Sequence, residues 1–415
     1  MLRRIPVKSV RLGMFIHEFV GSWMEHPFWR SQFLLDKEHD RQRILGSSLT
    51  ELWIDTSRGL DVENDEGVSV EQAEQAIDQR LEQAASAETP SFMQRSLQEE
   101  VAQAAQVCRK ARRAVQRMFQ DVRMGQAIDA EQMQPLVEDI ATSVMRNPSA
   151  IIGLARLKTQ NEYTYMHSVA VCALMSALAR QLQMEPDLVY QAGLAGLLHD
   201  IGKARIANAI LDKPGKLTDS EFATIKKHPE LGHAMLLAGK GVGAIPLDVC
   251  LHHHEKVDGS GYPHGLHGDQ ISVLARMGAI CDVYDAITSD RPYKRGWNPA
   301  EAMRKMAEWT QGHFDEQLFQ SFVKAVGIYP TGSLVRLSSQ RLAVVVEQSG
   351  EQLLKPKVRV FMDARTRRTI SEELIDLSQS DSQERILSRE SAEVWGLGSL
   401  DHLWHGDIHR IGEEN

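Results

Sequence analysis

The segment LLHDIGK (Leu197–Lys203) places a histidine and an aspartate side by side within an apolar run. The residues that precede them, LAGLL, carry no charge and predict burial. Burying an imidazole and a carboxylate without partners would cost on the order of several kcal/mol. A cation bound by both groups, together with other ligands, would remove that penalty. The segment therefore predicts a metal site if the rest of the chain supplies further ligands.

Further candidate ligands follow in the middle of the chain, where nine of the 16 histidines lie between residues 167 and 267. His228 precedes Pro229, so a helix must break or bend there, and its side chain can then point into a cavity. Asp282 lies among apolar neighbours, where a buried carboxylate needs a strong partner. The candidate set is His167, His199, Asp200, His228, Asp282 and two histidines of the run His252, His253 and His254.

These residues provide five imidazoles and two carboxylates without a thiolate, a donor set that suits Fe, Mn or Zn. Seven ligands exceed the usual shell of one ion. Two ions about 3.5–4 Å apart, bridged by a carboxylate, are the expected arrangement. Asp200 is the natural bridge, because it has two oxygens and lies centrally in the order of ligands. Such a pair generates hydroxide at neutral pH and holds an in-line displacement at phosphorus, which indicates phosphoester hydrolysis.

The composition describes the protein that must position these residues. A length of 415 residues predicts two to four domains, and 42% hydrophobic and 25% charged residues are typical of a globular protein. The net charge of −9 argues against a nucleic-acid-binding surface. No apolar run is long enough for a membrane span, and the N-terminus lacks a signal-peptide pattern. Four scattered cysteines without a CxxC pair predict reduced thiols and a cytoplasmic protein.

The element pattern predicts a mainly α protein. Strands are expected within residues 11–19 and 49–59, followed by Gln-, Glu-, Ala- and Arg-rich helices that break near Pro90. From residue 133 to 326 helix follows helix, with a capping box at Thr218 and Glu221. After residue 330 the pattern changes to strands. The helices after residue 69 are either a plain connector or a dimerising, signal-transmitting element, which would make the protein a homodimer.

Four motifs in order, HDIGK, IKKHPELG, HHEKVDGSGYPHG and DVYDAITSDRPYK, resemble the HD-GYP domain. This domain defines the bacterial cyclic di-GMP phosphodiesterases within the HD superfamily. The first 65 or so residues also resemble the small domain that often precedes it. The resemblance implies a small N-terminal α/β domain of unassigned function at residues 1–68 and an HD-GYP domain, with an all-helical HD-type metal-dependent hydrolase core, at residues 144–330. The element pattern adds a helical connector at residues 69–143 and a β-rich extension with a polar tail at residues 331–415.

The resemblance also implies the ligands of each ion. The first ion is expected to bind His167, His199, Asp200 and Asp282, and the second Asp200, His228, His253 and His254. His252 falls outside this set. In part of the family a glutamate four residues before the first histidine helps to hold a third ion, but here that residue is Tyr163. We therefore expect two divalent ions per chain, with iron as the first expectation and manganese as the alternative.

Further residues acquire roles toward the substrate through the resemblance. Lys203 is expected to contact the scissile phosphate and is a candidate to protonate the leaving group. Arg291 and Lys294 are expected to clamp phosphates, for which their side chains are suited. Gly261, Tyr262 and Pro263 form a loop that either borders the substrate and docks other signalling proteins, or is only structural.

The expected activity is hydrolysis of cyclic di-GMP by a bridging hydroxide, giving pGpG and then GMP if the linear product re-enters the site. Two alternatives remain: a catalytically slow sensor of cyclic di-GMP, and a phosphohydrolase for another nucleotide. Outside the ligand set, Asp285 is either a support for the site or a surface carboxylate. The basic stretch Cys108–Arg117 is expected to be a solvated helix face. His233, His264 and His267 are expected to be exposed.

Overall fold

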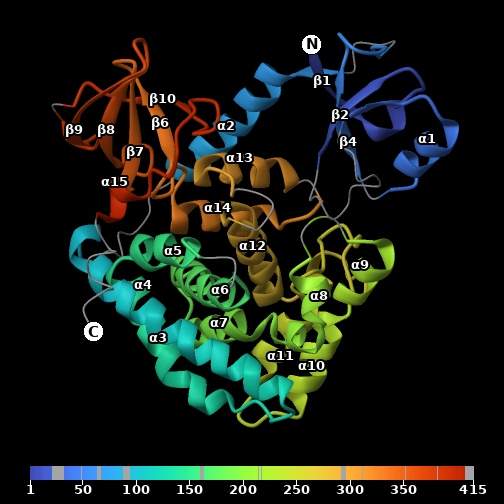
Figure 1. Ribbon diagram of the computed structural model, residues 1–415, viewed down its shortest axis with the longest axis vertical. Coiled ribbons are helices and arrows are strands. Elements are labelled where there is room, and N and C mark those ends of the chain that lie inside the picture. The colour runs from blue at the N-terminus through green and yellow to red at the C-terminus, as the bar shows by residue number, and fades with distance from the viewer. Residues whose placement is uncertain are drawn as a thin grey trace. The chain divides into compact units, whose positions relative to one another are not determined.

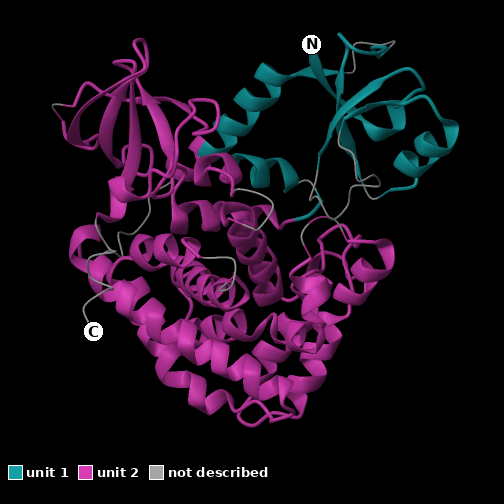
Figure 2. Cartoon of the chain, in the orientation of Figure 1, with its two compact units in different colours: residues 1–81, 304–313 teal, residues 82–303, 314–415 magenta. Residues whose placement is uncertain are grey.

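The structure is a computed structural model that describes residues 1–20, 32–47, 49–62, 67–86, 94–158, 163–213, 215, 217–290, 296–310, 312–350, 352–380 and 382–406. The chain divides into two compact units (Figure 2). One comprises residues 1–81 and 304–313, and the other residues 82–303 and 314–415. Among the helices described, none is both long and apolar enough to cross a membrane.

The first unit is built on a five-stranded antiparallel sheet in the order β3-β2-β4-β1-β5. Side chains such as Ile5, Ile16 and Leu52 from its middle strands are fully buried and pack in one core with Ile44 of helix α1. Its elements are β1 (Leu2–Pro6), β2 (Phe15–Phe19), β3 (Phe33–Leu34), α1 (Glu38–Leu45), β4 (Glu51–Asp55), β5 (Val68–Ser69) and most of α2 (Val70–Ser86).

The strands predicted within residues 11–19 and 49–59 are confirmed as β2 and β4. Strand β1 was not predicted, because two consecutive arginines interrupt its apolar pattern. In the structure these side chains have acidic partners: Arg3 pairs with Asp61 at 3.0 Å, and Arg4 pairs with Glu51. A charged strand is therefore accommodated next to β4 by ion pairs that a local pattern does not reveal.

The helical part of the second unit surrounds α6 (Tyr163–Gln181), whose residues 166–179 are all buried. Helix α6 packs against α3, α4, α5, α7, α12 and α14 (Figure 1). The prediction of helix after helix is confirmed. These helices are α3 (Leu97–Arg123), α4 (Gln134–Arg146), α5 (Pro148–Arg156), α7 (Pro186–Leu198), α8 (Asn208–Leu211), α9 (Asp219–Ile225), α10 (His228–Leu237), α11 (Ala244–His252), α12 (Val273–Thr288) and α14 (Glu316–Val326), while α13 (Pro299–Trp309) runs from this unit into the first.

The second unit also contains an antiparallel sheet in the order β10-β6-β7-β8-β9. The three strands predicted from the sequence are β6, β7 and β8, whereas β9 and β10 were not predicted because their side chains are mostly polar and at least partly exposed. The fold class is confirmed as mainly helical with two small sheets. The elements are β6 (Leu334–Leu337), β7 (Arg341–Glu347), β8 (Lys357–Asp363), β9 (Arg368–Asp376), β10 (Ile386–Arg389) and α15 (His402–His405).

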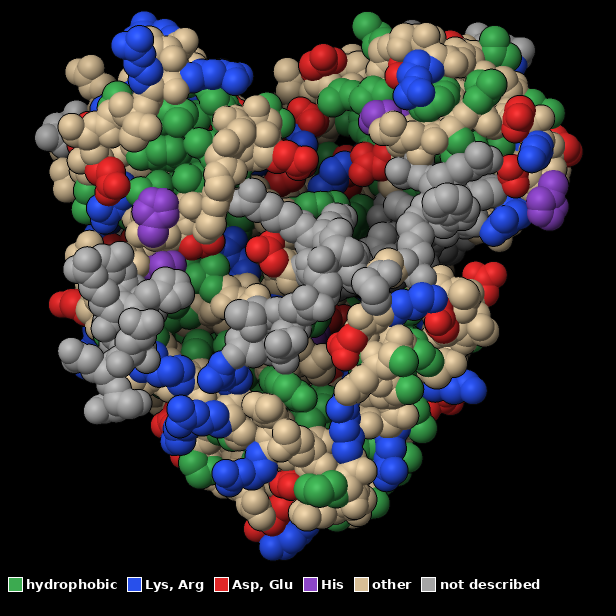
Figure 3. Space-filling model, viewed as in Figure 1, with side chains coloured by type: hydrophobic (Ala, Val, Ile, Leu, Met, Phe, Trp, Pro, Cys, Tyr) green, Lys and Arg blue, Asp and Glu red, His purple; other side chains and the backbone are tan. Residues whose placement is uncertain are grey.

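The basic stretch Cys108–Arg117 lies within α3, whose apolar side chains face the core. Lys110, Arg113 and Arg117 are exposed, and Lys110 pairs with Asp139 at 2.5 Å. Figure 3 shows basic and acidic side chains side by side over the helical part of this unit. The prediction of a solvated helix face is confirmed.

Helix boundaries determine where His228 points. The predicted capping box is present, since Thr218 Oγ1 accepts from the backbone N–H of Glu221 at 3.3 Å and Glu221 accepts from the N–H of Thr218 at 2.6 Å. This box starts α9, which ends at Ile225. Helix α10 then begins at His228 with Pro229 in its first turn. The expected break before Pro229 is confirmed, and it directs the imidazole into the interior.

Gly202 gives a first prediction, on stability. A Cβ at this position would lie 1.9 Å from the backbone oxygen of His228 and 2.6 Å from the backbone nitrogen of Gly232. Both are backbone atoms of α10, so the clash can be relieved only by moving that helix. Gly202→Ala should lower the free energy of unfolding by about 3 kcal/mol or more in urea denaturation. Gly398→Ala is the control, because a Cβ there has no neighbour within 4 Å. Equal stability of the two variants would contradict the packing described.

Candidate metal centre

Five segments of the second unit bring the seven predicted ligands together. Helix α6 carries His167, and His199 and Asp200 directly follow α7. Helix α10 begins with His228, the end of α11 leads into His253 and His254, and α12 carries Asp282. Three groups of side chains have ligand atoms within 4.8 Å of one another. The groups are His167 with His199 and Asp282, His228 with His253 and His254, and His199 with Asp200 and His253.

Asp200 lies between two groups of histidines and is fully buried. Its Oδ2 atom is 3.4 Å from the Nε2 atoms of both His167 and His199. Its Oδ1 atom is 3.2 Å from Nε2 of His228 and 3.9 Å from Nε2 of His253. Each oxygen of one carboxylate thus faces a different pair of imidazoles. This is the geometry required of a bridging ligand.

Asp282 approaches the same histidines from α12. Its Oδ1 atom is 3.0 Å from Nε2 of His167 and 3.9 Å from Nε2 of His199. Its other oxygen is 3.9 Å from Nδ1 of His254. Asp282 therefore lies on the side of the centre that contains His167 and His199, with one oxygen directed toward the other group.

Backbone carbonyls fix the orientation of three imidazoles. The Nδ1 atom of His199 lies 2.7 Å from the oxygen of Gly196, and that of His228 lies 2.8 Å from the oxygen of Ile225. Nδ1 of His253 lies 3.0 Å from the oxygen of Val249. Because a carbonyl can only accept, each Nδ1 carries the proton. The Nε2 lone pair of each neutral ring then points into the centre, as a metal ligand requires.

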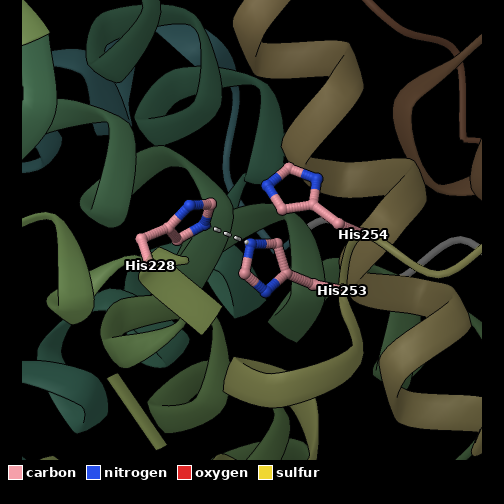
Figure 4. A group of neighbouring side chains, drawn as sticks. All are labelled: His228, His253 and His254. Carbon is pink, nitrogen blue, oxygen red and sulfur yellow. Dashed lines mark hydrogen bonds between the residues drawn. The ribbon is translucent and has the colours of Figure 1, made fainter. Parts of the chain in front are cut away.

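Two of these lone pairs face each other. The Nε2 atoms of His228 and His253 are 3.3 Å apart, and Figure 4 shows the two rings pointing at one another with His254 beside them. Two acceptors at this distance repel unless a proton or a cation lies at the contact. Together with His254, these rings can supply three nitrogen ligands to one ion.

Buried polar atoms provide the test of whether ions fit. Nε2 of His199 and Oδ1 of Asp200 are buried without a hydrogen-bond partner in the part of the chain that the structure describes. Such atoms are costly when they are unsatisfied. The donor set of imidazole nitrogens and carboxylate oxygens matches divalent Fe, Mn or Zn. The residues present therefore fit bound metal ions.

The electrostatics favour neutral imidazoles at His253 and His254 and an ionised carboxylate at Asp200. Burial, with His199 and His228 close by, lowers the pKa of His253 to about 3. Burial and the adjacent His253 also hold the pKa of His254 well below its usual range. Burial opposes ionisation of Asp200, but Lys203 and His199 hold the pKa of this carboxyl well below its usual range. Lone pairs and negative charge are thus both available to a cation.

Lys203 lies at the edge of this centre. It follows Asp200 in the short 3-10 helix formed by residues 201–205. Its ammonium group pairs with Asp200 Oδ2, and 23% of its side chain is exposed. A cation that touches the central carboxylate and also reaches solvent can contact an anionic substrate. The two other predicted phosphate contacts, Arg291 and Lys294, lie outside the described residues.

The Gly261-Tyr262-Pro263 loop packs onto the histidines. The ring of Tyr262 stacks on that of His254, with centroids 4.7 Å apart. The backbone N–H of Tyr262 donates to the oxygen of His254 at 3.1 Å. A Cβ at Gly261 would lie 2.5 Å from Cα of Glu255, so only glycine allows this approach. The loop therefore borders the centre directly.

Glu255 holds the far side of the same loop. It is buried, and its two carboxylate oxygens accept the backbone N–H groups of His264 at 2.7 Å and Leu266 at 3.0 Å. The neighbouring His252 contacts Asp248 at 2.8 Å and His264 at 3.2 Å. His264 and His267 are exposed as predicted, whereas His233 is only partly exposed, because α10 is packed on one side.

Two residues of the site were not identified from the sequence. The sequence leaves Asp285 open between a support for the site and a surface carboxylate, and in the structure it is buried with an oxygen 2.6 Å from Nδ1 of His167. Lys158, which no sequence motif marks, is buried against the same carboxylate. The spacing of Asp285 three residues after Asp282 was a usable signal. A lysine just after a helix is ordinarily exposed, so the sequence contains no signal that Lys158 belongs to the site.

Comparison with known proteins agrees with this architecture. A domain of unknown function matches residues 2–133, the HD domain matches residues 137–318, and a KOW domain associated with the HD domain matches residues 334–383. The fold and the centre of histidines and aspartates thus define an HD-domain protein, and HD-domain phosphodiesterases depend on metal ions.

Similar proteins define the family more narrowly. A cyclic di-GMP phosphodiesterase of Pseudomonas aeruginosa is 55% identical over 98% of this chain and 96% of its own length. A cyclic di-GMP phosphodiesterase response regulator of Xanthomonas campestris is 40% identical over 36% of this chain and 41% of its own. A 3'3'-cGAMP-specific phosphodiesterase of Vibrio cholerae is 34% identical over 41% and 37%, respectively. The chain belongs to the HD-GYP family of cyclic dinucleotide phosphodiesterases.

Proposed function

We propose that this protein hydrolyses cyclic di-GMP at a centre of two divalent ions. The observation that carries the proposal is the position of Asp200, whose two oxygens face two different pairs of histidines. The similarity to the Pseudomonas aeruginosa phosphodiesterase over nearly the full length of both chains supports the substrate. Hydrolysis adds water across one P–O3′ bond, so that the linear dinucleotide pGpG is the first product.

The seven ligands and Lys203 have distinct roles in this proposal. His167, His199, Asp200 and Asp282 would hold the first ion, and Asp200, His228, His253 and His254 would hold the second. Bound ions would supply an activated water and neutralise charge on the phosphate. Lys203, which is partly exposed beside Asp200, contacts the scissile phosphate and provides the proton that the leaving 3′ oxygen requires.

The remaining residues bind the substrate. Gly261, Tyr262 and Pro263 border the cyclic dinucleotide, and Arg291 and Lys294 clamp its phosphates. Conversion of pGpG to GMP follows if the linear product binds again with its second phosphodiester at the centre. We further propose that the loop at Gly261 docks other signalling proteins and that the helices after residue 69 support a homodimer.

The number of ions gives the next prediction. Tyr163 occupies the position from which a glutamate would reach a third ion, and its ring stacks on His167 with centroids 5.9 Å apart. A neutral phenol is a poor ligand for a hard cation, so we expect two ions per chain, iron first and manganese as the alternative. Elemental analysis of protein purified without oxygen measures this ratio. Tyr163→Glu should raise it toward three, and three ions in the unaltered protein would contradict the prediction.

Turnover of defined substrates tests the function. The full chain, loaded anaerobically with iron or manganese, should convert cyclic di-GMP to pGpG. Cyclic GMP-AMP belongs in the same assay because a relative in Vibrio cholerae is named for cGAMP. The nucleotide dGTP is included to test the alternative of a phosphohydrolase for another nucleotide. Faster turnover of either would reassign the substrate. Tight binding of cyclic di-GMP without product would favour the alternative of a catalytically slow sensor.

A further inference from the structure

We infer that Lys158 and Asp285 are positioning residues that hold His167 as a ligand of the first ion. The inference rests on the proposed function, since it assumes that His167 binds metal. Asp285 lies on α12, one helical turn after Asp282, and Lys158 lies between α5 and α6. Neither has been assigned a role as a ligand or a substrate contact. Both act through the ring of His167.

The three side chains form a buried chain of contacts. Oδ2 of Asp285 lies 2.6 Å from Nδ1 of His167, and the same oxygen pairs with Nζ of Lys158. Their exposed fractions are 2% for His167, 2% for Asp285 and 6% for Lys158. The other oxygen of Asp285 accepts from the hydroxyl of Ser289 at 3.3 Å. The carboxylate is thus held from both sides and cannot rotate away from the imidazole without losing these contacts.

His167 differs in this respect from three of the other histidines. Nδ1 of His199, His228 and His253 faces backbone carbonyls, whereas Nδ1 of His167 faces a carboxylate. A carboxylate partner fixes the Nδ1–H tautomer and makes Nε2 a stronger donor to a metal. That Nε2 atom is directed at Asp282 and Asp200, at 3.0 and 3.4 Å. The first ion would therefore have one ligand, His167, whose ring is oriented by a carboxylate rather than by a backbone carbonyl.

Lys158 stabilises the ionised carboxylate of Asp285, which is buried. Both buried charges lose their hydration, but their mutual attraction offsets part of that cost, whereas a buried carboxylate without a cation has no such compensation. The ammonium of Lys158 also lies over the ring of Tyr163, 5.2 Å from its centroid, and that ring stacks on His167 at an interplanar angle of 9°. Asp285 and Lys158 therefore lie at the Nδ1 edge of the imidazole, and the ring of Tyr163 covers one of its faces.

Metal affinity distinguishes positioning from a purely structural ion pair. Asp285→Asn keeps the shape of the side chain but removes its charge. We expect the affinity for one of the two ions to fall about 10–100-fold. After dialysis against a weak chelator, the metal content should drop from about two ions per chain toward one, while the second ion stays. In turnover with excess metal, kcat should fall more than KM changes.

Variants of Lys158 provide an independent test if Asp285→Asn does not fold. Lys158→Met should lose the first ion in the same dialysis, and Lys158→Arg, which keeps the charge, should retain more of it. Glu100→Gln is the matched control. It disrupts another buried ion pair of this unit, in which Glu100 accepts from Arg146 at 2.6 and 2.7 Å. This variant should lower the melting temperature and keep both ions.

The outcomes separate the two proposals. Loss of one ion in Asp285→Asn or Lys158→Met, but not in Glu100→Gln, supports the positioning role. The positioning role is overturned if Asp285→Asn or Lys158→Met folds and binds both ions with unaltered affinity. If the unaltered protein binds no divalent ions, the proposed function itself fails, whatever the variants do.

Discussion

Asp200→Ala should abolish hydrolysis of cyclic di-GMP, with a loss in kcat of about 10⁴-fold or more, as when a residue shared by a whole catalytic unit is removed. The reason is geometric. Oδ2 of Asp200 faces His167 and His199, and Oδ1 faces His228 and His253. One substitution therefore removes an oxygen ligand from both ion positions and leaves four imidazoles without their common carboxylate.

The assay for Asp200→Ala combines product formation with metal content. Purified protein should show no pGpG above background and fewer than two ions per chain, with a helical circular dichroism spectrum. Asp187→Ala is the matched control, because Asp187 is an exposed carboxylate in the first turn of α7, at the opposite end from Asp200. Native turnover in Asp200→Ala would show that the bridging role is wrong.

Lys203→Met should lower kcat by about 10²–10³-fold, the range for loss of one positioned proton donor or charge. The metal content should not fall, because the Lys203 ammonium pairs with Asp200 Oδ2 and competes with cations for it. The substitution keeps an unbranched side chain of similar length and removes the ammonium group. The expected signature is a fully metal-loaded protein that turns over slowly.

The control for Lys203→Met is Arg205→Met, which removes an exposed cation from the same short helix. Steady-state rates and elemental analysis of both variants measure the difference. If Lys203→Met lost metal as well as activity, Lys203 would be supporting the centre rather than contacting the substrate. If its kcat were unaltered, the proposed contact with the scissile phosphate would be absent.

Part of the ligand set could be predicted from the residues themselves because His199, Asp200 and Asp282 lie in apolar segments, whereas the choice of His253 and His254 followed from the resemblance. An imidazole or carboxylate in such a segment must find a partner. His199 and Asp200 are adjacent, so a single cation can serve as the partner of both. The break before Pro229 predicted the direction of His228, and the structure confirms the break. Local chemistry was sufficient for these residues, since burial and charge together restrict what they can do.

Other parts depend on contacts that a local pattern does not contain. Lys158, which follows α5, and Asp285 of α12 are 127 residues apart and meet only in the folded chain. Strand β9 alternates poorly and is mostly exposed, and it is held by its neighbour β8 with ion pairs such as Arg359 with Glu372 at 3.2 Å. In both cases the partner lies in another element, so that tertiary packing decides the outcome.

The proposed chemistry depends most on two ions that share Asp200. Anomalous diffraction from crystals of the metal-loaded protein, with data on both sides of the iron and manganese edges, measures this directly. We predict two peaks per chain about 3.5–4 Å apart, one within ligand distance of each oxygen of Asp200. A single peak, or a pair of peaks that both lie away from Asp200, would contradict the binuclear centre.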